Sequence, residues 1–389
     1  MCGVIRTVAV QGYRSIRDLT LELSGLDVVT GANGSGKSNL YRALRLLAGC
    51  ADGSVVPAIA RDGGLSSILW AGPEKPSKEV VAGRAPAQGT VRRGPVGLRL
   101  GYASDDLGYL VDLGIPPQGQ SPFVNDPELK REQVFHGAVA RPGSLLVDRH
   151  GPDIRVRDEP WRHLEQQVLP QQSVLAEAAG LEGAPEIAAV RRDILGWRFY
   201  DHFRTDPDAP ARAPTMGTIS PVLAHDGANL AAALATIAFQ GDQGGVDAAV
   251  EAAFPGSTLA THVRADGRVE VALRQPGLLR SLTPGELSDG TLRYLLLVAA
   301  LKTTRPPGLM VLNEPETSLH RDLLPSLAAL IAEAGRSSQV LVVTHAPELI
   351  DGLAAHGARR HELTKDPGGT GVAGRGGLLE VPRWVWPGR

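Results

Sequence analysis

Residues 31–38 read GANGSGKS and fit the pattern G-x-x-x-x-G-K-[ST] at every fixed position. They follow an apolar run at residues 26–30 and precede apolar side chains at helical spacing in residues 40–47, which is the strand and helix context that the pattern requires. The glycines let backbone N–H groups wrap phosphates, Lys37 offsets phosphate charge, and Ser38 ligates Mg²⁺. This segment, the P-loop, therefore predicts a site for a nucleoside triphosphate with Mg²⁺.

Three later segments place polar residues at the ends of expected elements. The sequence LSDGT at residues 287–291 precedes an apolar helix, with Ser288 and Gly290 where an N-cap and bare N–H groups are typical, although an ordinary capped helix has the same pattern. Two short apolar runs, at residues 309–312 and 340–344, are typical of buried parallel strands and are followed by Asn313-Glu314 and by His345. A strand that ends in a carboxylate and a second that ends in a histidine thus follow the LSDGT segment.

The four segments occur in the order found in ABC-type ATPases, and the chain resembles the RecF-like, SMC-related predicted ATPases of that class. GYRSI at residues 12–16 and DGANL at residues 226–230 are also similar to that group. The resemblance extends over residues 1–48 and 220–350 and covers the middle of the chain only loosely.

This resemblance implies that the protein is an ATPase whose Glu314 polarises the attacking water while His345 contacts the γ-phosphate. It also implies that Ser288 and Gly290 reach ATP held by a second copy, so that two heads form a homodimer around ATP and separate after hydrolysis. The residues expected to bind ATP are Gly31, Asn33, Gly34, Ser35, Gly36, Lys37, Ser38, Asn39, Ser288, Gly290 and Arg14. Mg²⁺ is expected at Ser38, Asn313 and Gln172.

One position departs from the pattern of the family. Most relatives carry Asp before the catalytic Glu, whereas this chain has Asn313, which accepts a hydrogen bond from Mg²⁺-bound water but brings no charge. We therefore expect slow turnover, and a site that binds ATP without cleaving it is the alternative. Gln172 lies where ABC ATPases place a Mg²⁺-sensing glutamine. Arg14 lies on the turn before the P-loop strand and either faces the nucleotide or is surface.

The implied fold is of the α/β class: an ABC-type head with a mixed or parallel core sheet, flanking antiparallel strands and an inserted helical lobe. The expected divisions are an N-terminal part of the nucleotide-binding lobe at residues 1–170, a helical lobe at 171–257, a C-terminal part of the nucleotide-binding lobe at 258–365 and a tail at 366–389.

Local patterns predict the individual elements. Alternating or apolar runs predict strands at residues 4–10, 19–23, 96–102, 109–115, 133–139 and 144–156, and a hairpin of 261–265 with 269–273. Apolar residues three and four apart predict helices at residues 174–179, 184–199 and 229–239. Residues 52–94 are rich in Gly, Pro, Ala and Ser and predict loops with at most one short helix, with disorder near residues 73–95.

Composition narrows the class of protein. A formal charge of -2 gives no global field toward nucleic acid or anionic lipid, so a DNA contact would need a local patch such as Arg92-Arg93, Lys130-Arg131 or Arg191-Arg192. Only two cysteines are present, which excludes a Cys-based zinc site and fits a cytoplasmic protein. No stretch of 18 apolar residues occurs, so we expect no membrane span.

We compare three hypotheses for the function of the protein. The first is an ATP-gated head that acts on DNA in repair or in genome defence. The second is an ATP-sensing scaffold that regulates an effector partner such as a nuclease. The third, a transporter ATPase subunit, is disfavoured because about 250 residues separate Ser38 from Leu287. A long-armed SMC protein is excluded because those residues lack heptads.

Overall fold

A computed structural model describes residues 3–70, 72, 97–116, 126–158, 160–180, 183–201, 203–366, 368–374 and 383–388. The chain divides into two compact units. The P-loop unit comprises Met1–Ser24, Val29–Trp197 and His361–Arg389. The second unit comprises Gly25–Val28 and Arg198–Arg360, and we call it the signature unit because it contains the LSDGT segment, the signature turn, at residues 287–291. The expected disorder near residues 73–95 and much of the expected tail lie outside the described residues.

The P-loop unit contains an eight-stranded sheet of order β2-β1-β4-β5-β6-β7-β8-β9, in which every neighbouring pair is antiparallel. Its strands are β1 Ile5–Tyr13, β2 Ile16–Glu22, β4 Gly97–Ser104, β5 Leu107–Gly114, β6 Glu128–His136, β7 Leu145–His150, β8 Asp153–Val156 and β9 Arg162–His163. Arg14, with a φ of 46°, turns the chain from β1 to β2. The predicted antiparallel strands in this part of the chain are confirmed, except that residues 144–156 form two strands, β7 and β8, joined by a turn.

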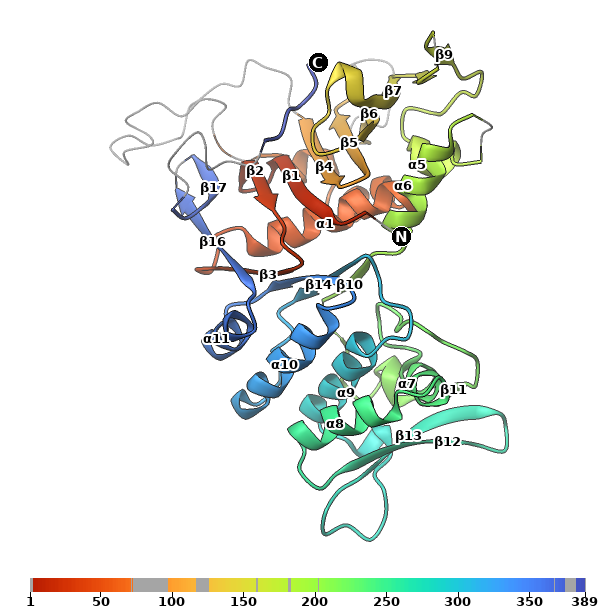
Figure 1. Ribbon diagram of the computed structural model, residues 1–389, viewed down its shortest axis with the longest axis vertical. Helices are drawn as coiled ribbons and strands as arrows, with labels where there is room; N and C mark the ends of the chain where they lie inside the picture. The colour runs from red at the N-terminus through yellow and green to blue at the C-terminus, as the bar shows by residue number, and fades with distance from the viewer. Residues whose placement is uncertain are drawn as a thin grey trace. The chain divides into compact units, whose positions relative to one another are not determined.

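The helices described in the P-loop unit are α1 Lys37–Asp52, α2 Val55–Arg61, α3 Leu65–Ile68, α5 Val174–Glu177 and α6 Pro185–Leu195. Of these, α1 and α6 pack on the sheet (Figure 1). α1 contacts β1 and β4 through an apolar face that includes Leu40, Leu44 and Leu47, and α6 contacts β5, β6 and β7. The expectation of at most one short helix in residues 52–94 is wrong, because both α2 and α3 form before residue 70, where buried Val55, Ile59 and Leu65 anchor them.

The signature unit is built on the parallel strands β10, β14 and β15. Their bounds are β10 Arg198–Tyr200, β14 Leu309–Asn313 and β15 Gln339–Val343. The parallel strands predicted at 309–312 and 340–344 are thus confirmed. The helix predicted over 184–199 ends early, since Leu195 is its last residue and Gly196 its C-cap. The following residues pair with β14 instead, because a parallel neighbour satisfies their backbone groups.

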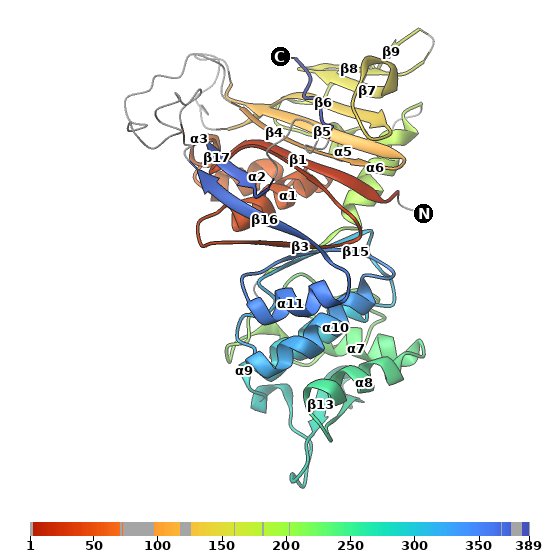
Figure 2. The same ribbon diagram turned by 60° about the vertical axis from the view of Figure 1, so that its left-hand side comes forward.

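The remaining elements of this unit include the signature helix α9, which contacts α7, α8 and α10 (Figure 2). They are β11 Thr215–Met216, α7 Leu230–Phe239, α8 Gln243–Ala253, β12 Thr258–Val263, β13 Arg268–Arg274, α9 Asp289–Leu301, α10 Leu324–Ala334 and α11 Pro347–Ala355, with short 3₁₀ turns η2 Pro210–Arg212, η3 Pro284–Glu286 and η4 Arg321–Leu323. Every α9 residue from Leu292 to Leu301 is buried, so this helix is the centre of the core. The predicted hairpin is confirmed as β12 and β13, whereas α8 was not predicted because two glycines obscure its pattern.

A six-stranded sheet has the order β10-β14-β15-β3-β16-β17, where β3 is Leu26–Gly31, β16 is Arg359–Asp366 and β17 is Gly369–Val372. The α/β class with a parallel core and flanking antiparallel strands is therefore confirmed. The four predicted domain divisions stay a prediction: of the helices in residues 171–257, α5 and α6 belong to the P-loop unit, and α7 and α8 to the signature unit. No helix among the described residues is long and apolar enough to span a membrane.

Candidate active site

The P-loop is shaped by glycines that no other residue can replace without strain. Gly31, Gly34 and Gly36 have φ angles of 142°, 80° and 110°, which residues with a side chain rarely adopt. A Cβ atom on Gly31 would lie 2.3 Å from the carbonyl oxygen of Leu363, and one on Gly36 would lie 2.4 Å from Thr370 Oγ1. The close approach of two C-terminal strands thus adds a steric requirement to the conformational one.

Lys37 begins helix α1 and is 6% exposed. Its ammonium group donates to the carbonyl oxygens of Gly31 at 2.5 Å and Ala32 at 3.1 Å, so the loop folds around its own cation. No side chain caps the helix N-terminus at Gly36, which leaves the N–H groups of the first turn available to an anion. Asn33, Gly34 and Ser38 are exposed at the rim of the loop.

Hydroxyl groups from distant segments support the loop. Thr370 Oγ1 donates to the Ser35 carbonyl oxygen at 2.9 Å and shares a 2.8 Å hydrogen bond with Ser15 Oγ. The Asn39 side chain donates to the same Ser15 Oγ at 2.9 Å. The predicted ligand Asn39 therefore also connects α1 to the β1–β2 turn. The Ser35 hydroxyl oxygen is buried and has no hydrogen-bond partner among the described residues.

Two predicted ligands of the P-loop unit have other partners in the structure. The Arg14 guanidinium pairs with Asp62 at 2.8 Å and lies over the Tyr13 ring. Gln172 Oε1 accepts the backbone N–H of Leu169 at 3.2 Å in a local turn. Their roles toward nucleotide and Mg²⁺ stay predictions.

In the signature unit, strand β14 ends at Asn313, whose side chain faces a carboxylate. Asn313 Nδ2 donates to Asp201 Oδ1 at 2.7 Å, and Asp201 directly follows β10, the parallel neighbour of β14. Asn313 Oδ1 is buried without a hydrogen-bond partner among the described residues. The charge that Asn313 lacks is thus present on the adjacent strand end.

Glu314 has a strained backbone and an accessible carboxylate. Its φ is 47°, and its N–H donates to the Val343 carbonyl oxygen at 2.7 Å, which holds the residue at the end of β15. The Glu314 carboxylate, 39% exposed, lies 3.7 Å from His345 Nδ1. The structure therefore brings the predicted general base and the predicted histidine together.

Glu316 is the buried member of this group. Its Oε1 accepts the Thr344 hydroxyl at 2.5 Å and the His345 backbone N–H at 3.3 Å, and lies 3.5 Å from His345 Nδ1. Its Oε2 has no hydrogen-bond partner among the described residues. Glu316 thus fixes the turn that presents His345.

Arg293 is a nearly fully buried cation on the signature helix. It donates to the carbonyl oxygens of Glu314 at 3.2 Å and Asp201 at 3.3 Å, and so connects α9 to both strand ends. Burial lowers the pKa of Arg293, and the nearby carboxylates of Glu316, Asp201 and Glu314 oppose that shift.

No group of three or more His, Cys, Asp or Glu residues in the described part of the chain is arranged to hold a metal ion by itself.

The signature turn is exposed on its unit. Ser288 is the N-cap of α9 and accepts the Thr291 N–H at 3.2 Å. A Cβ atom on Gly290 would lie 2.8 Å from the Ser318 carbonyl oxygen, so glycine is needed for the close packing there. Ser288 is exposed and Gly290 partly exposed, and neither is buried against its own unit.

Sequence reasoning missed several residues of the site. Asp201 and Thr370 carry no local signal, because their partners lie 112 and 335 positions away. Arg293 did carry one, since a single charge within the apolar residues 292–301 indicates a buried cation with specific partners. Of the candidate basic clusters, Lys130 and Arg131 pair with Glu128 and Asp148, Arg191 donates to a backbone carbonyl, and Arg92-Arg93 lies outside the described residues.

Solved structures share the fold. The Smc head bound to the C-winged helix domain of ScpA matches with a TM-score of 0.52 and 13% identity, covering 95% of this chain and 97% of that chain. The Smc head with an extended coiled coil bound to the C-terminal domain of ScpA, from Pyrococcus furiosus, matches with a TM-score of 0.52 and 13% identity, covering 95% and 96%. The predicted SMC-related head fold is thereby confirmed.

No curated protein matches this sequence. A family model described as "AAA domain, putative AbiEii toxin, Type IV TA system" matches residues 28–351. That range includes the P-loop, the signature turn and both strand ends described above, and the chain therefore belongs to this family of P-loop ATPases.

Proposed function

We propose that the protein binds ATP with Mg²⁺ at the P-loop and hydrolyses it slowly. The observation that carries the proposal is the preformed loop: three glycines in left-handed conformations, a buried Lys37 inside the loop and an uncapped helix N-terminus. The glycine conformations and the contacts of Lys37 restrict the loop to one conformation, so little conformational entropy is lost when phosphate binds. Phosphate oxygens would replace the carbonyl partners of Lys37, and Ser35, Ser38 and Asn39 complete the set.

Glu314 is proposed as the group that polarises the attacking water and accepts its proton. Its backbone conformation is constrained, and its carboxylate is accessible to water. His345, whose Nδ1 lies 3.7 Å from that carboxylate, is proposed to contact the γ-phosphate. Mg²⁺, when bound, would offset the charge that develops on the phosphates. Asn313 and Ser38 are the proposed contacts to its hydration shell, and the unpartnered Asn313 Oδ1 fits that role. Because Asn313 carries no charge, turnover is expected to be slow.

ATP is proposed to join two copies through the signature turn. Ser288 is exposed and Gly290 partly exposed at the start of a buried helix, so they can contact a triphosphate that is bound to the P-loop of a second copy. Hydrolysis would remove the bridging γ-phosphate and release the copies.

For the cellular role we propose genome defence or DNA repair. The description of the family, which names a toxin of a Type IV TA system, favours defence. A second candidate is an ATP-sensing scaffold that holds an effector such as a nuclease. It is favoured by the two Smc heads above, both of which were crystallised with a protein partner.

The test combines ATPase rate and molecular size. The wild type is expected to hydrolyse ATP slowly, Glu314→Gln to pair stably with saturating ATP, and Lys37→Ala to lose ATP binding. A Glu314→Gln protein that stays monomeric with saturating ATP would refute the pairing. ATP hydrolysis by Lys37→Ala at the wild-type rate would refute the assigned site.

A further inference from the structure

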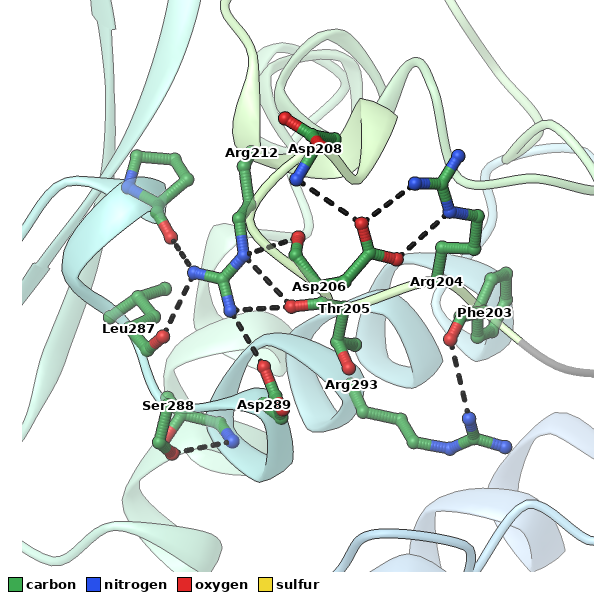
Figure 3. Close-up of polar contacts among 12 residues, drawn as sticks. Phe203, Arg204, Thr205, Asp206, Asp208, Arg212, Leu287, Ser288, Asp289 and Arg293 are labelled. Carbon is green, nitrogen blue, oxygen red and sulfur yellow. Dashed lines mark hydrogen bonds and ion pairs between the residues drawn. The ribbon is translucent and has the colours of Figure 1, made fainter.

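Arg212 connects two loops of the signature unit that are far apart in the sequence (Figure 3). Its side chain is only 10% exposed. On one side it donates to the carbonyl oxygens of Thr205 at 2.6 Å and Asp206 at 3.1 Å, which follow strand β10. On the other side it donates to the carbonyl oxygens of Pro284 at 2.6 Å and Leu287 at 2.9 Å, directly before the signature turn.

The same guanidinium neutralises an acidic residue within the signature turn. Arg212 pairs with the carboxylate of Asp289 at 2.8 Å, and the Asp289 side chain is 61% exposed. Asp289 is the first residue of α9 and lies between Ser288 and Gly290. A carboxylate there suits the helix dipole, but without a cation it repels any phosphate that approaches those neighbours.

We infer that Arg212 is the positioning residue of the signature turn, which it holds by the Leu287 carbonyl and makes receptive to phosphate by neutralising Asp289. This inference rests on the proposed pairing of two copies around ATP. A role in folding alone would change the free energy of unfolding and leave the ATP-dependent pairing of the folded protein unchanged. The proposed role instead makes that pairing depend on the charge on Asp289 and on salt, because added salt screens the repulsion between Asp289 and phosphate.

The experiment is a double-mutant cycle in the Glu314→Gln parent. Arg212→Gln, Asp289→Asn and the double variant are compared by analytical ultracentrifugation with saturating ATP, at low and high salt. Arg204→Gln is the matched control, because Arg204 lies on the loop that Arg212 contacts and its guanidinium pairs with Asp206 at 2.7 Å. If Arg212→Gln does not fold, Arg212→Lys replaces it, because lysine keeps the positive charge and loses the several hydrogen bonds of the planar guanidinium.

Arg212→Gln is expected to weaken ATP-dependent pairing about tenfold at low salt, and less at high salt. The loss should be several times smaller in the Asp289→Asn background. Binding of a fluorescent ATP analogue to the monomer should stay unchanged, as should pairing of Arg204→Gln. An equal loss in both backgrounds, or unaltered pairing of Arg212→Gln, would overturn the inference. A parent that stays monomeric with ATP would instead refute the pairing itself.

Discussion

Substitution of Asn313 by Asp tests the contact between the two strand ends. Asparagine and aspartate have nearly the same size and shape, so the change appears conservative. In this structure, however, Asn313 Nδ2 lies 2.7 Å from Asp201 Oδ1, and an aspartate oxygen in its place would oppose a second carboxylate. The substitution converts a hydrogen bond into a like-charge contact.

The magnitude follows from that distance. Two carboxylates whose charge centres lie about 4 Å apart repel by roughly 4 kcal/mol at an effective dielectric constant near 20. Side-chain rotation and solvent relieve part of this, because both residues are partly exposed. We expect Asn313→Asp to lower the free energy of unfolding by about 2 kcal/mol at pH 7 without nucleotide.

Urea unfolding followed by circular dichroism measures the change, and amide exchange of β14 localises it. The exchanged pair Asp201→Asn with Asn313→Asp is the control, since it keeps one carboxylate and one amide. It should recover the stability of the wild type to within about 0.5 kcal/mol. In the single variant a carboxyl of the pair has a raised folded-state pKa, so its deficit should shrink as the pH falls toward 4. The reasoning fails if Asn313→Asp is as stable as wild type, or if the exchanged pair is no more stable than the single variant.

Three further predictions concern the P-loop unit. Gly36→Ala should weaken binding of a fluorescent ATP analogue at least about tenfold, because its Cβ would lie 2.4 Å from Thr370 Oγ1 at a φ of 110°; unchanged affinity in a titration would contradict this. Glu132→Gln should lower the free energy of unfolding, measured by urea unfolding, by about 3 kcal/mol, because it leaves the fully buried Arg149 without its ion pair. A loss below about 1 kcal/mol would be inconsistent with that burial. Burial raises the pKa of the Asp148 carboxyl, but the hydrogen bonds from Arg155, Gln133 and Arg131 together outweigh burial and hold that pKa below its ordinary value. A depressed folded-state pKa contributes stability above about pH 4 that is lost as the pH falls, so the acid limb of the stability curve should be flatter for Asp148→Asn than for wild type.

The sequence by itself determined the phosphate-binding end of the site. The P-loop could be predicted because its groups are consecutive: one strand, one glycine loop and the first turn of one helix supply them. Glu314 and His345 could be placed near strand ends for a similar reason, since each follows an apolar run. These features depend on local backbone conformation, which local residue types largely decide.

Only the tertiary structure decided what stands beside these residues. Asp201 faces Asn313 because β10 lies next to β14, and Thr370 supports Ser35 because β17 returns to the P-loop from the other end of the chain. Strand order is set by the burial of whole surfaces and not by the periodicity of any one segment. For the same reason the helix expected to reach residue 199 stopped at Leu195, where pairing with β14 satisfied the backbone better than another helical turn.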